Sequence, residues 1–220
     1  KTSKEIICLL MAKIIAIDGP ASVGKSTLAK KISKKFKAPV LYSGKLYRAL
    51  ALEIVKRKIN FKNTEEILKY ITYIDLDNLN SAELYSSEVD KASSIISANQ
   101  LVRNKLITFQ RAFPKKHGDN IKFVIIEGRD IGTIIFPKAN YKIFLWAASE
   151  VRAKRRCEQL RKNGRNISYS KVFSEIKIRD QKDMTRKVAP LMPAANSVLL
   201  DTTYIDIEQA FNAIRKIIQI

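Results

Sequence analysis

The stretch AIDGPASVGKST, residues 16–27, decides the fold of this chain. It contains the spacing G-x-x-x-x-G-K-[ST], in which two glycines let the backbone wrap around a polyphosphate and direct its N–H groups inward. The apolar residues 14–17 before it predict a buried parallel strand, and residues 26–36 after it place apolar side chains on one face of a helix. Strand, glycine turn and helix follow one another in the order of a phosphate-binding P-loop, so we expect the chain to bind ATP or GTP.

The residues of this loop have distinct expected roles. The positive end of the helix dipole behind the loop adds to its attraction for anions. Lys25 would reach the β- and γ-phosphates, and Ser26 would hold Mg²⁺. The ATP-binding residues that the motif predicts are Gly19, Pro20, Ala21, Ser22, Val23, Gly24, Lys25, Ser26 and Thr27.

Length and composition bound the remaining possibilities. With 220 residues, 46% of them hydrophobic, the chain is long enough for one α/β domain with an appended lobe. No apolar run is long enough for a membrane span, and two cysteines form no disulfide framework. We therefore expect a cytoplasmic protein that does not bind a membrane. Residues 1–10 contain no cleavage-site pattern, and we expect them to be an extension outside a domain over residues 11–220.

The net charge of +20 has three interpretations. Strongly basic chains often bind nucleic acid, but a lysine-rich surface can also reflect residue usage, and a site for several phosphates needs positive charge as well. The lysines are scattered through most segments rather than gathered into one tract, which argues against a stable nucleic-acid partner. The single histidine, His117, lies in an expected loop, so histidine-based metal or general-base chemistry is not expected.

Apolar runs alternate with helical periodicity along the rest of the chain. Further strands are expected at residues 39–44, 122–126, 141–146 and 198–201, and helices after residue 44 and over residues 88–113, 149–162, 169–186 and 206–218. This alternation predicts an α/β fold with a doubly wound, parallel, five-stranded sheet. Ligand-binding groups gather at the carboxyl ends of the strands in such sheets.

Arginines collect at these strand ends and on shared helix faces. Four groups stand out: Arg48 in SGKLYR; Arg129 beside Asp130; Arg152, Arg155 and Arg156 at i, i+3 and i+4; and Arg179, Asp183 and Arg186 at i, i+4 and i+7. Both helical spacings put their side chains on one face. A guanidinium binds phosphate oxygens in pairs and stays charged. Each group alone could be a solvated surface, but together, behind a P-loop, they favour a site for two phosphate-bearing ligands.

The motifs together resemble the bacterial cytidylate kinases of the nucleoside monophosphate kinase superfamily. The matching segments are IDGPASVGKST (17–27), SGKLYRALAL (43–52), QRAF (110–113), EGRDIGTIIFP (127–137), KIFLWAASEVRAKRR (142–156), EIKIRDQKDMTRKVAPLMPA (175–194) and LLDTT (199–203). They reach almost from residue 14 to the C-terminus in the family's order. The pair GRDxGT…FP and IxxRDxxDxxRxxAPLxPA is specific to this family, whereas many families share the P-loop.

The resemblance implies a P-loop core (residues 11–42, 121–148 and 187–220), a helical monophosphate-binding lobe (about 43–120) and a lid with its following helix (about 149–186). It implies a monomer in which ATP, with Mg²⁺, phosphorylates CMP and dCMP to CDP and dCDP. The family's pattern gives Arg48 and Arg129 to the acceptor phosphate, Arg111, Asp130 and Arg186 to the cytosine, Arg179 and Asp183 to the ribose, and Arg152, Arg155 and Arg156 to the transferring phosphoryl group. Ser43 and Glu127 complete the expected substrate-binding residues, and Lys25 and Arg129 join the three lid arginines as expected catalytic residues.

Three departures from the family's pattern are visible. Tyr42 stands where the family usually has Asp, and Glu127 replaces the first Asp of Asp-Gly-Arg-Asp. Family members usually carry short β-strands in the monophosphate lobe, and residues 76–88 are too short to hold them. Kinases for another nucleoside monophosphate, UMP above all, remain alternatives. A nucleic-acid-binding P-loop ATPase is a more distant one, because no aromatic platform accompanies a basic tract.

Overall fold

The computed structural model describes residues 12–74, 81–117, 121–162 and 164–218. The chain folds into two compact units, of which the first is Lys1–Val40 with His117–Ile220 and the second is Leu41–Lys116. The extension expected at residues 1–10 lies outside the described residues. Within the described part of the chain, no helix is long and apolar enough to cross a membrane.

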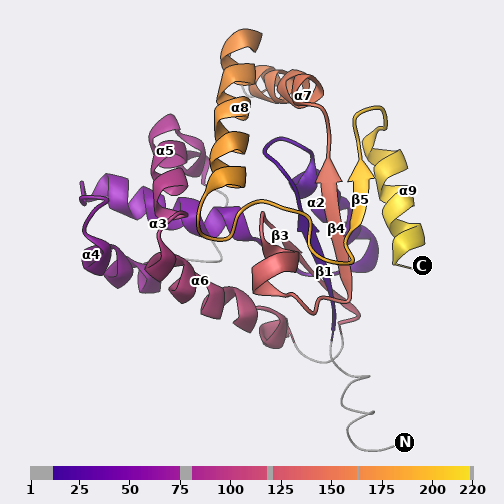
Figure 1. The fold of residues 1–220 in the computed structure, drawn as a ribbon, viewed down its shortest axis with the longest axis horizontal. Coiled ribbons are helices and arrows are strands. Elements are labelled where there is room, and N and C mark those ends of the chain that lie inside the picture. The colour runs from indigo at the N-terminus through magenta and orange to yellow at the C-terminus, as the bar shows by residue number, and fades with distance from the viewer. Residues whose placement is uncertain (1–11, 75–80, 118–120, 163, 219–220) are drawn as a thin grey trace, which may run out of the picture. The chain divides into compact units, whose positions relative to one another are not determined.

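The strands form one five-stranded sheet in the order β2-β3-β1-β4-β5 (Figure 1). Their bounds are Lys13–Asp18 (β1), Val40–Tyr42 (β2), Phe123–Glu127 (β3), Tyr141–Trp146 (β4) and Val198–Asp201 (β5). β1 lies between β3 and β4 and runs parallel to both, and β4 pairs in parallel with β5. The central strands are almost continuously apolar, as strands covered on both faces are. The predicted α/β fold with a parallel five-stranded sheet is confirmed.

Two helices pack beside the sheet of the first unit. α2 (Lys25–Phe36) contacts β1 and β3, and it also contacts α9 (Ile207–Ile217). The buried side of α2 is the predicted apolar face with Leu28, Ala29 and Ile32. α9 begins at a capping box in which the side chains of Asp206 and Gln209 each accept the other's backbone N–H. Both helices therefore start within one residue of the predicted position.

α7 (Ser149–Lys162) and α8 (Tyr169–Thr185) pack against each other in the first unit. They share a small apolar cluster that consists of Ala153, Cys157, Leu160, Val172 and Ile176. The bounds agree with the predicted helices to within a residue. A short π-helix, Ile131–Ile135, follows β3 and was not predicted.

The second unit is built from helices. Its elements are α3 (Ser43–Lys56), α4 (Thr64–Lys69), the 3₁₀ turns Tyr70–Tyr73 and Ala82–Tyr85, α5 (Ser87–Ile96) and α6 (Gln100–Ala112). Two expectations need correction. β2 ends at Tyr42, so residues 43–44 open α3 rather than close the strand. The single helix expected at residues 88–113 is two helices, because the side chain of Asn99 caps a new helix by accepting the N–H groups of residues 101 and 102.

Candidate functional site

The loop between β1 and α2 has the backbone that its glycines predict. Gly19 has a φ of +146°, and a Cβ atom at this position would collide with the main-chain carbonyl of Leu145 in β4. Gly24, with a φ of +100°, is the N-terminal cap of α2. Only glycine adopts such angles without strain. The loop therefore lies close against the sheet and presents the start of α2.

Lys25 is buried within this loop, with 5% of its surface exposed. Its Nζ atom donates to the carbonyl oxygen of Pro20 at 2.7 Å. Burial, and then the nearby Arg129 guanidinium, lower the pKa of Lys25 to about 7, against the pull of the Glu127 and Asp18 carboxylates. The lysine that the motif assigns to phosphates is thus held inside the loop by a bond that a phosphate oxygen could replace.

Ser26 and Glu127 lie side by side. The Ser26 hydroxyl donates to Oε2 of Glu127 at 2.9 Å, and Glu127 is the buried last residue of β3. β3 pairs with β1 so that Glu127 is level with Ile17, which brings the carboxylate to the loop. A hydroxyl and a carboxylate oxygen are ligands that suit Mg²⁺, which takes few protein ligands and completes its shell with phosphates and water. Among the described residues, no group of three or more His, Cys, Asp and Glu side chains could hold a metal ion by itself.

Asp18 is a buried carboxylate that the sequence analysis did not single out. Only 4% of its surface is exposed, and its two oxygens accept the N–H groups of Ile131 and Gly132 at 2.9 and 2.7 Å. Burial raises the pKa of Asp18 to about 6, although the two hydrogen bonds oppose the rise. The end of β1 is thereby tied to the turn after β3. The signal in the sequence that could have identified Asp18 is a polar residue at the end of an apolar strand.

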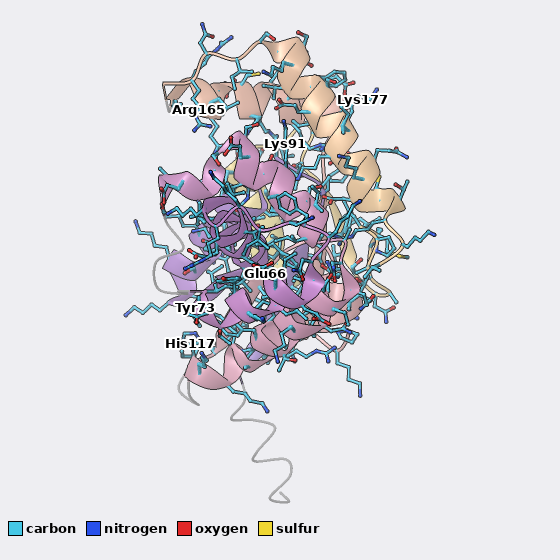
Figure 2. The ribbon with its side chains drawn as sticks, turned by 90° about the vertical axis from the view of Figure 1, so that its left-hand side faces the viewer. Glu66, Tyr73, Lys91, His117, Arg165 and Lys177 are labelled. Carbon is cyan, nitrogen blue, oxygen red and sulfur yellow. The ribbon has the colours of Figure 1, made fainter. Side chains whose placement is uncertain are left out.

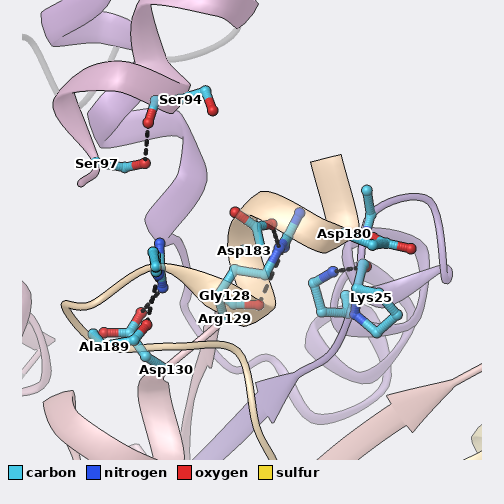
Figure 3. A network of polar contacts seen from close by, with 12 residues as sticks. Lys25, Ser94, Ser97, Gly128, Arg129, Asp130, Asp180, Asp183 and Ala189 are labelled. Carbon is cyan, nitrogen blue, oxygen red and sulfur yellow. Dashed lines mark hydrogen bonds and ion pairs between the residues drawn. The ribbon is translucent and has the colours of Figure 1, made fainter. Parts of the chain in front are cut away.

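Arg129 and Asp183 form an ion pair (Figure 3). The Nε atom of Arg129, which follows β3, donates to Oδ2 of Asp183 on α8 at 3.0 Å. Burial alone would raise the pKa of Asp183, but the guanidiniums of Arg129, Arg179 and Arg186 hold it below its usual value. Asp183, which was predicted to lie near the ribose, is thus bonded to Arg129, which was predicted to hold the acceptor phosphate.

Asp130 and Arg186, two of the three residues predicted to lie around the cytosine, also lie together. A guanidinium nitrogen of Arg186 is 3.7 Å from Oδ1 of Asp130, and both side chains are largely buried. The Nε atom of Arg186 donates to the carbonyl oxygen of Ala189 at 2.6 Å, which fixes the direction of the side chain after α8 ends.

The three arginines of α7 have different partners. Arg152 is buried and donates to the carbonyl oxygens of Ala147 and Ala21 and to Asp180. The Arg155 guanidinium instead donates to the hydroxyl and carbonyl oxygens of Thr202, in the loop after β5. Arg156 donates to Gln159 on its own helix. The shared helix face of the prediction is present, but the structure does not direct these three side chains to one point.

Ser43, Arg48 and Arg111 belong to the second unit. Ser43 is buried and accepts a hydrogen bond from the amide of Gln110, which is itself fully buried. Arg48 forms an ion pair with Asp90 and donates to the carbonyl oxygen of Leu84 at 2.8 Å. These contacts fix both predicted side chains within the lobe.

Arg111 is exposed, whereas Arg103 of the same helix is buried. The Arg103 guanidinium lies 5.8 Å from the centre of the Tyr47 ring and donates to the carbonyl oxygen of Ser97 at 3.0 Å. Arg103 was not singled out from the sequence, and Gln110 was noted only as part of the segment QRAF, without a role. Both are polar residues on the inner face of α6, and their spacing of seven residues was the signal that could have found them.

Comparison with known proteins gives three findings. The profile of the family described as "Cytidylate kinase" matches residues 15–220. The curated protein "Cytidylate kinase" of Fusobacterium nucleatum is 40% identical over 94% of this chain and 97% of its own length, and the protein of the same name from Methylocella silvestris is 39% identical over 94% of each. A solved structure of an uncharacterized protein from Eubacterium ventriosum superposes with a TM-score of 0.55 at 16% identity, over 94% of this chain and 98% of that one, and supports the fold alone.

Proposed function

This chain belongs to the cytidylate kinase family, and we propose that it transfers the γ-phosphoryl group of ATP to CMP and dCMP. The observation that carries the proposal is the cluster at the carboxyl edge of the sheet. There Lys25, the Ser26–Glu127 pair and the Arg129–Asp183 pair lie within one compact unit. Phosphoryl transfer asks a protein mainly for positioning and positive charge, and these groups supply both.

On the donor side, the P-loop would hold the phosphates of ATP. Lys25 would exchange its bond to the Pro20 carbonyl for a phosphate oxygen and would regain its full charge beside that anion. The Ser26 hydroxyl and the Glu127 carboxylate would hold Mg²⁺, directly or through water. When bound, the ion neutralises charge on the phosphates.

On the acceptor side, Arg129 is the candidate for the monophosphate in the first unit, with a side chain that Asp183 already holds in place. Asp130 and Arg186 are candidates for the base, and Arg179 and Asp183 are candidates for the ribose. In the second unit, Ser43, Arg48 and Arg111 stay candidates from the sequence.

The test is a coupled assay of ADP release with ATP and Mg²⁺, in which CMP, dCMP, UMP, AMP, GMP and TMP are offered separately. We expect turnover with CMP and dCMP. Strong turnover with UMP alone would favour the alternative substrate. No turnover with any monophosphate, together with ATP hydrolysis that RNA stimulates, would favour a nucleic-acid-dependent ATPase and overturn the proposal.

Lys25→Ala is the variant that we would compare with the wild type in this assay. We expect it to lose at least about a hundredfold in kcat, because it removes a group that faces the transferring phosphoryl. Its melting temperature should stay close to that of the wild type, because loss of the buried ammonium also removes the cost of keeping a charge away from water.

We also propose a cytoplasmic monomer. Gel filtration with light scattering tests the monomer by giving the mass of one chain, and a mass of two chains would contradict it.

A further inference from the structure

Helix α8 carries two carboxylates that reach different parts of the first unit. Asp183 bonds to Arg129, which follows β3. Asp180, three residues earlier, lies at the P-loop, where its Oδ1 atom accepts the N–H of Ala21 at 3.2 Å. Residues spaced i and i+3 lie on one face of a helix. A single face of α8 therefore touches both the loop that would hold ATP and the arginine that would hold the acceptor phosphate (Figure 3).

Arg152 completes the contact at the P-loop. Its Nη1 atom lies 2.5 Å from Oδ2 of Asp180 and 3.0 Å from the carbonyl oxygen of Ala21, and its Nε donates to the carbonyl oxygen of Ala147 at 2.8 Å. Ala21 is thus held at its N–H by Asp180 and at its C=O by Arg152. Only 7% of Asp180 and 2% of Arg152 are exposed. A buried ion pair with further hydrogen bonds on both partners has one favourable geometry.

We propose that Asp180 is a positioning residue for phosphoryl transfer, which fixes the P-loop relative to Arg129 through one turn of α8. The inference rests on the proposed function, because the donor role of the P-loop and the acceptor role of Arg129 are parts of it. Both oxygens of Asp180 are engaged by Ala21 and Arg152. Asp180 therefore acts through the loop rather than on either nucleotide.

Binding and transfer depend on this arrangement to different degrees. ATP alone would be held by the P-loop, and the acceptor phosphate alone would be held by Arg129. The affinity for each nucleotide therefore tolerates a small shift of the group that holds the other nucleotide. Transfer requires the γ-phosphorus and the attacking oxygen to be in line, and a misplacement of about 1 Å can cost about a hundredfold in rate. Loss of Asp180 should therefore lower kcat much more than it weakens the binding of ATP or CMP.

The experiment compares Asp180→Ala and Asp180→Asn with the wild-type enzyme. We would measure kcat with ATP and CMP, and the Kd of each nucleotide alone by calorimetry. For Asp180→Ala we expect kcat to fall by at least about tenfold while each Kd changes by less than about threefold. Asp180→Asn keeps an oxygen that can accept the Ala21 N–H, so it should recover part of kcat. Glu175→Ala, an exposed carboxylate on the same helix, is the control and should match the wild type.

Stability has to be separated from positioning, because Asp180→Ala leaves the Arg152 guanidinium buried without its carboxylate. Melting curves set the assay temperature below the transition of every variant. If Asp180→Ala does not fold, Asp180→Asn alone must show the fall in kcat with both Kd values kept.

Two results would overturn the inference alone. One is a folded Asp180 variant with wild-type kcat, and the other is a fall in kcat that comes with an equally large weakening of the Kd for ATP or CMP. A wild-type enzyme without turnover would instead overturn the proposed function, and the inference with it.

Discussion

Replacing Asp18 should change stability in a way that depends on pH. The carboxylate accepts two buried N–H groups, from Ile131 and Gly132, and an acceptor lost at such a group costs about 1–3 kcal/mol. Asp18→Asn keeps the size of the side chain and one acceptor oxygen, so it should lose one of the two bonds. The penalty for burying the charge is removed at the same time. The two effects have opposite signs, and only the second depends on pH.

The sign follows from the raised pKa of Asp18. Between its ordinary value of 3.8 and its folded value of about 6, the folded chain binds more protons than the unfolded chain. The contribution of Asp18 to the free energy of unfolding therefore falls as pH rises through this window. Between pH 4.5 and 7.5 the fall is about 2 kcal/mol. The free energy of unfolding of the wild type should exceed that of Asp18→Asn by the largest margin at pH 4.5. This margin should shrink by about 2 kcal/mol by pH 7.5.

Urea unfolding followed by far-ultraviolet circular dichroism at pH 4.5, 5.5, 6.5 and 7.5 measures this difference. Asp201→Asn is the control, and its difference in stability from the wild type should stay nearly flat from pH 4.5 to 7.5. The Thr203 hydroxyl and N–H hold the pKa of Asp201 below its usual value, so its contribution is present at neutral pH and is lost as pH falls through that lowered pKa. A difference between wild type and Asp18→Asn that is flat with pH, or that grows toward pH 7.5, would refute the reasoning.

Three further outcomes are expected. Gly19→Ala places a Cβ against the backbone of β4 at a φ of +146° and should lose more than about 2 kcal/mol in urea unfolding, whereas Gly44→Ala meets no atom within 4 Å and should change stability by less than about 1 kcal/mol. Asp183→Asn breaks the ion pair with Arg129 and should cost about 1–3 kcal/mol at pH 7, a loss that disappears as pH falls through the lowered pKa of Asp183; a loss that persists at low pH would contradict the pairing. Arg186→Ala should raise the KM for CMP far more than the KM for ATP in the coupled assay, and equal effects on both would place this residue elsewhere.

The sheet and most helices could be predicted because their signals are local. The P-loop spacing specifies a strand, a turn and a helix within twelve residues, and the apolar face of α2 follows directly from its periodicity. The division of residues 88–113 was missed because apolar residues recur at helical spacing on both sides of the break. Asn99, which caps the second helix with its side chain, was a local signal that a search for caps could have found.

Partners of site residues were harder to predict than the residues themselves. The spacing of Arg152 and Arg155 correctly put them on one helix, but Arg152 bonds to Asp180 and Arg155 bonds to Thr202. These contacts join segments 28 and 47 residues apart, and they depend on how α7 packs on α8 and beside β5. Spacing along one helix carries no information about such neighbours. Asp18 was missed for the same reason, since its importance lies in the turn that it bonds.

The excess of positive charge lies mainly outside the candidate site. Lysines such as Lys91 and Lys177 are exposed on the surface (Figure 2). Salt screens exposed charges of this kind, so they act through a general field that attracts anionic substrates. The surface lysines are therefore suited to bringing nucleotides to the protein rather than to orienting them.

The candidate site itself is close to charge balance. Around the P-loop and the end of β3, the buried or half-buried cations are Lys25, Arg129, Arg152, Arg179 and Arg186, and the carboxylates are Asp18, Glu127, Asp130, Asp180 and Asp183. A phosphate that enters such a site meets guanidiniums that carboxylates already hold in fixed rotamers, so little side-chain entropy remains to be lost on binding. The same pairing weakens the ground-state attraction for phosphate, since Arg129, Arg152 and Arg186 are each paired with a carboxylate. A site of this kind favours orientation over affinity, which is what a transfer reaction between two bound nucleotides requires.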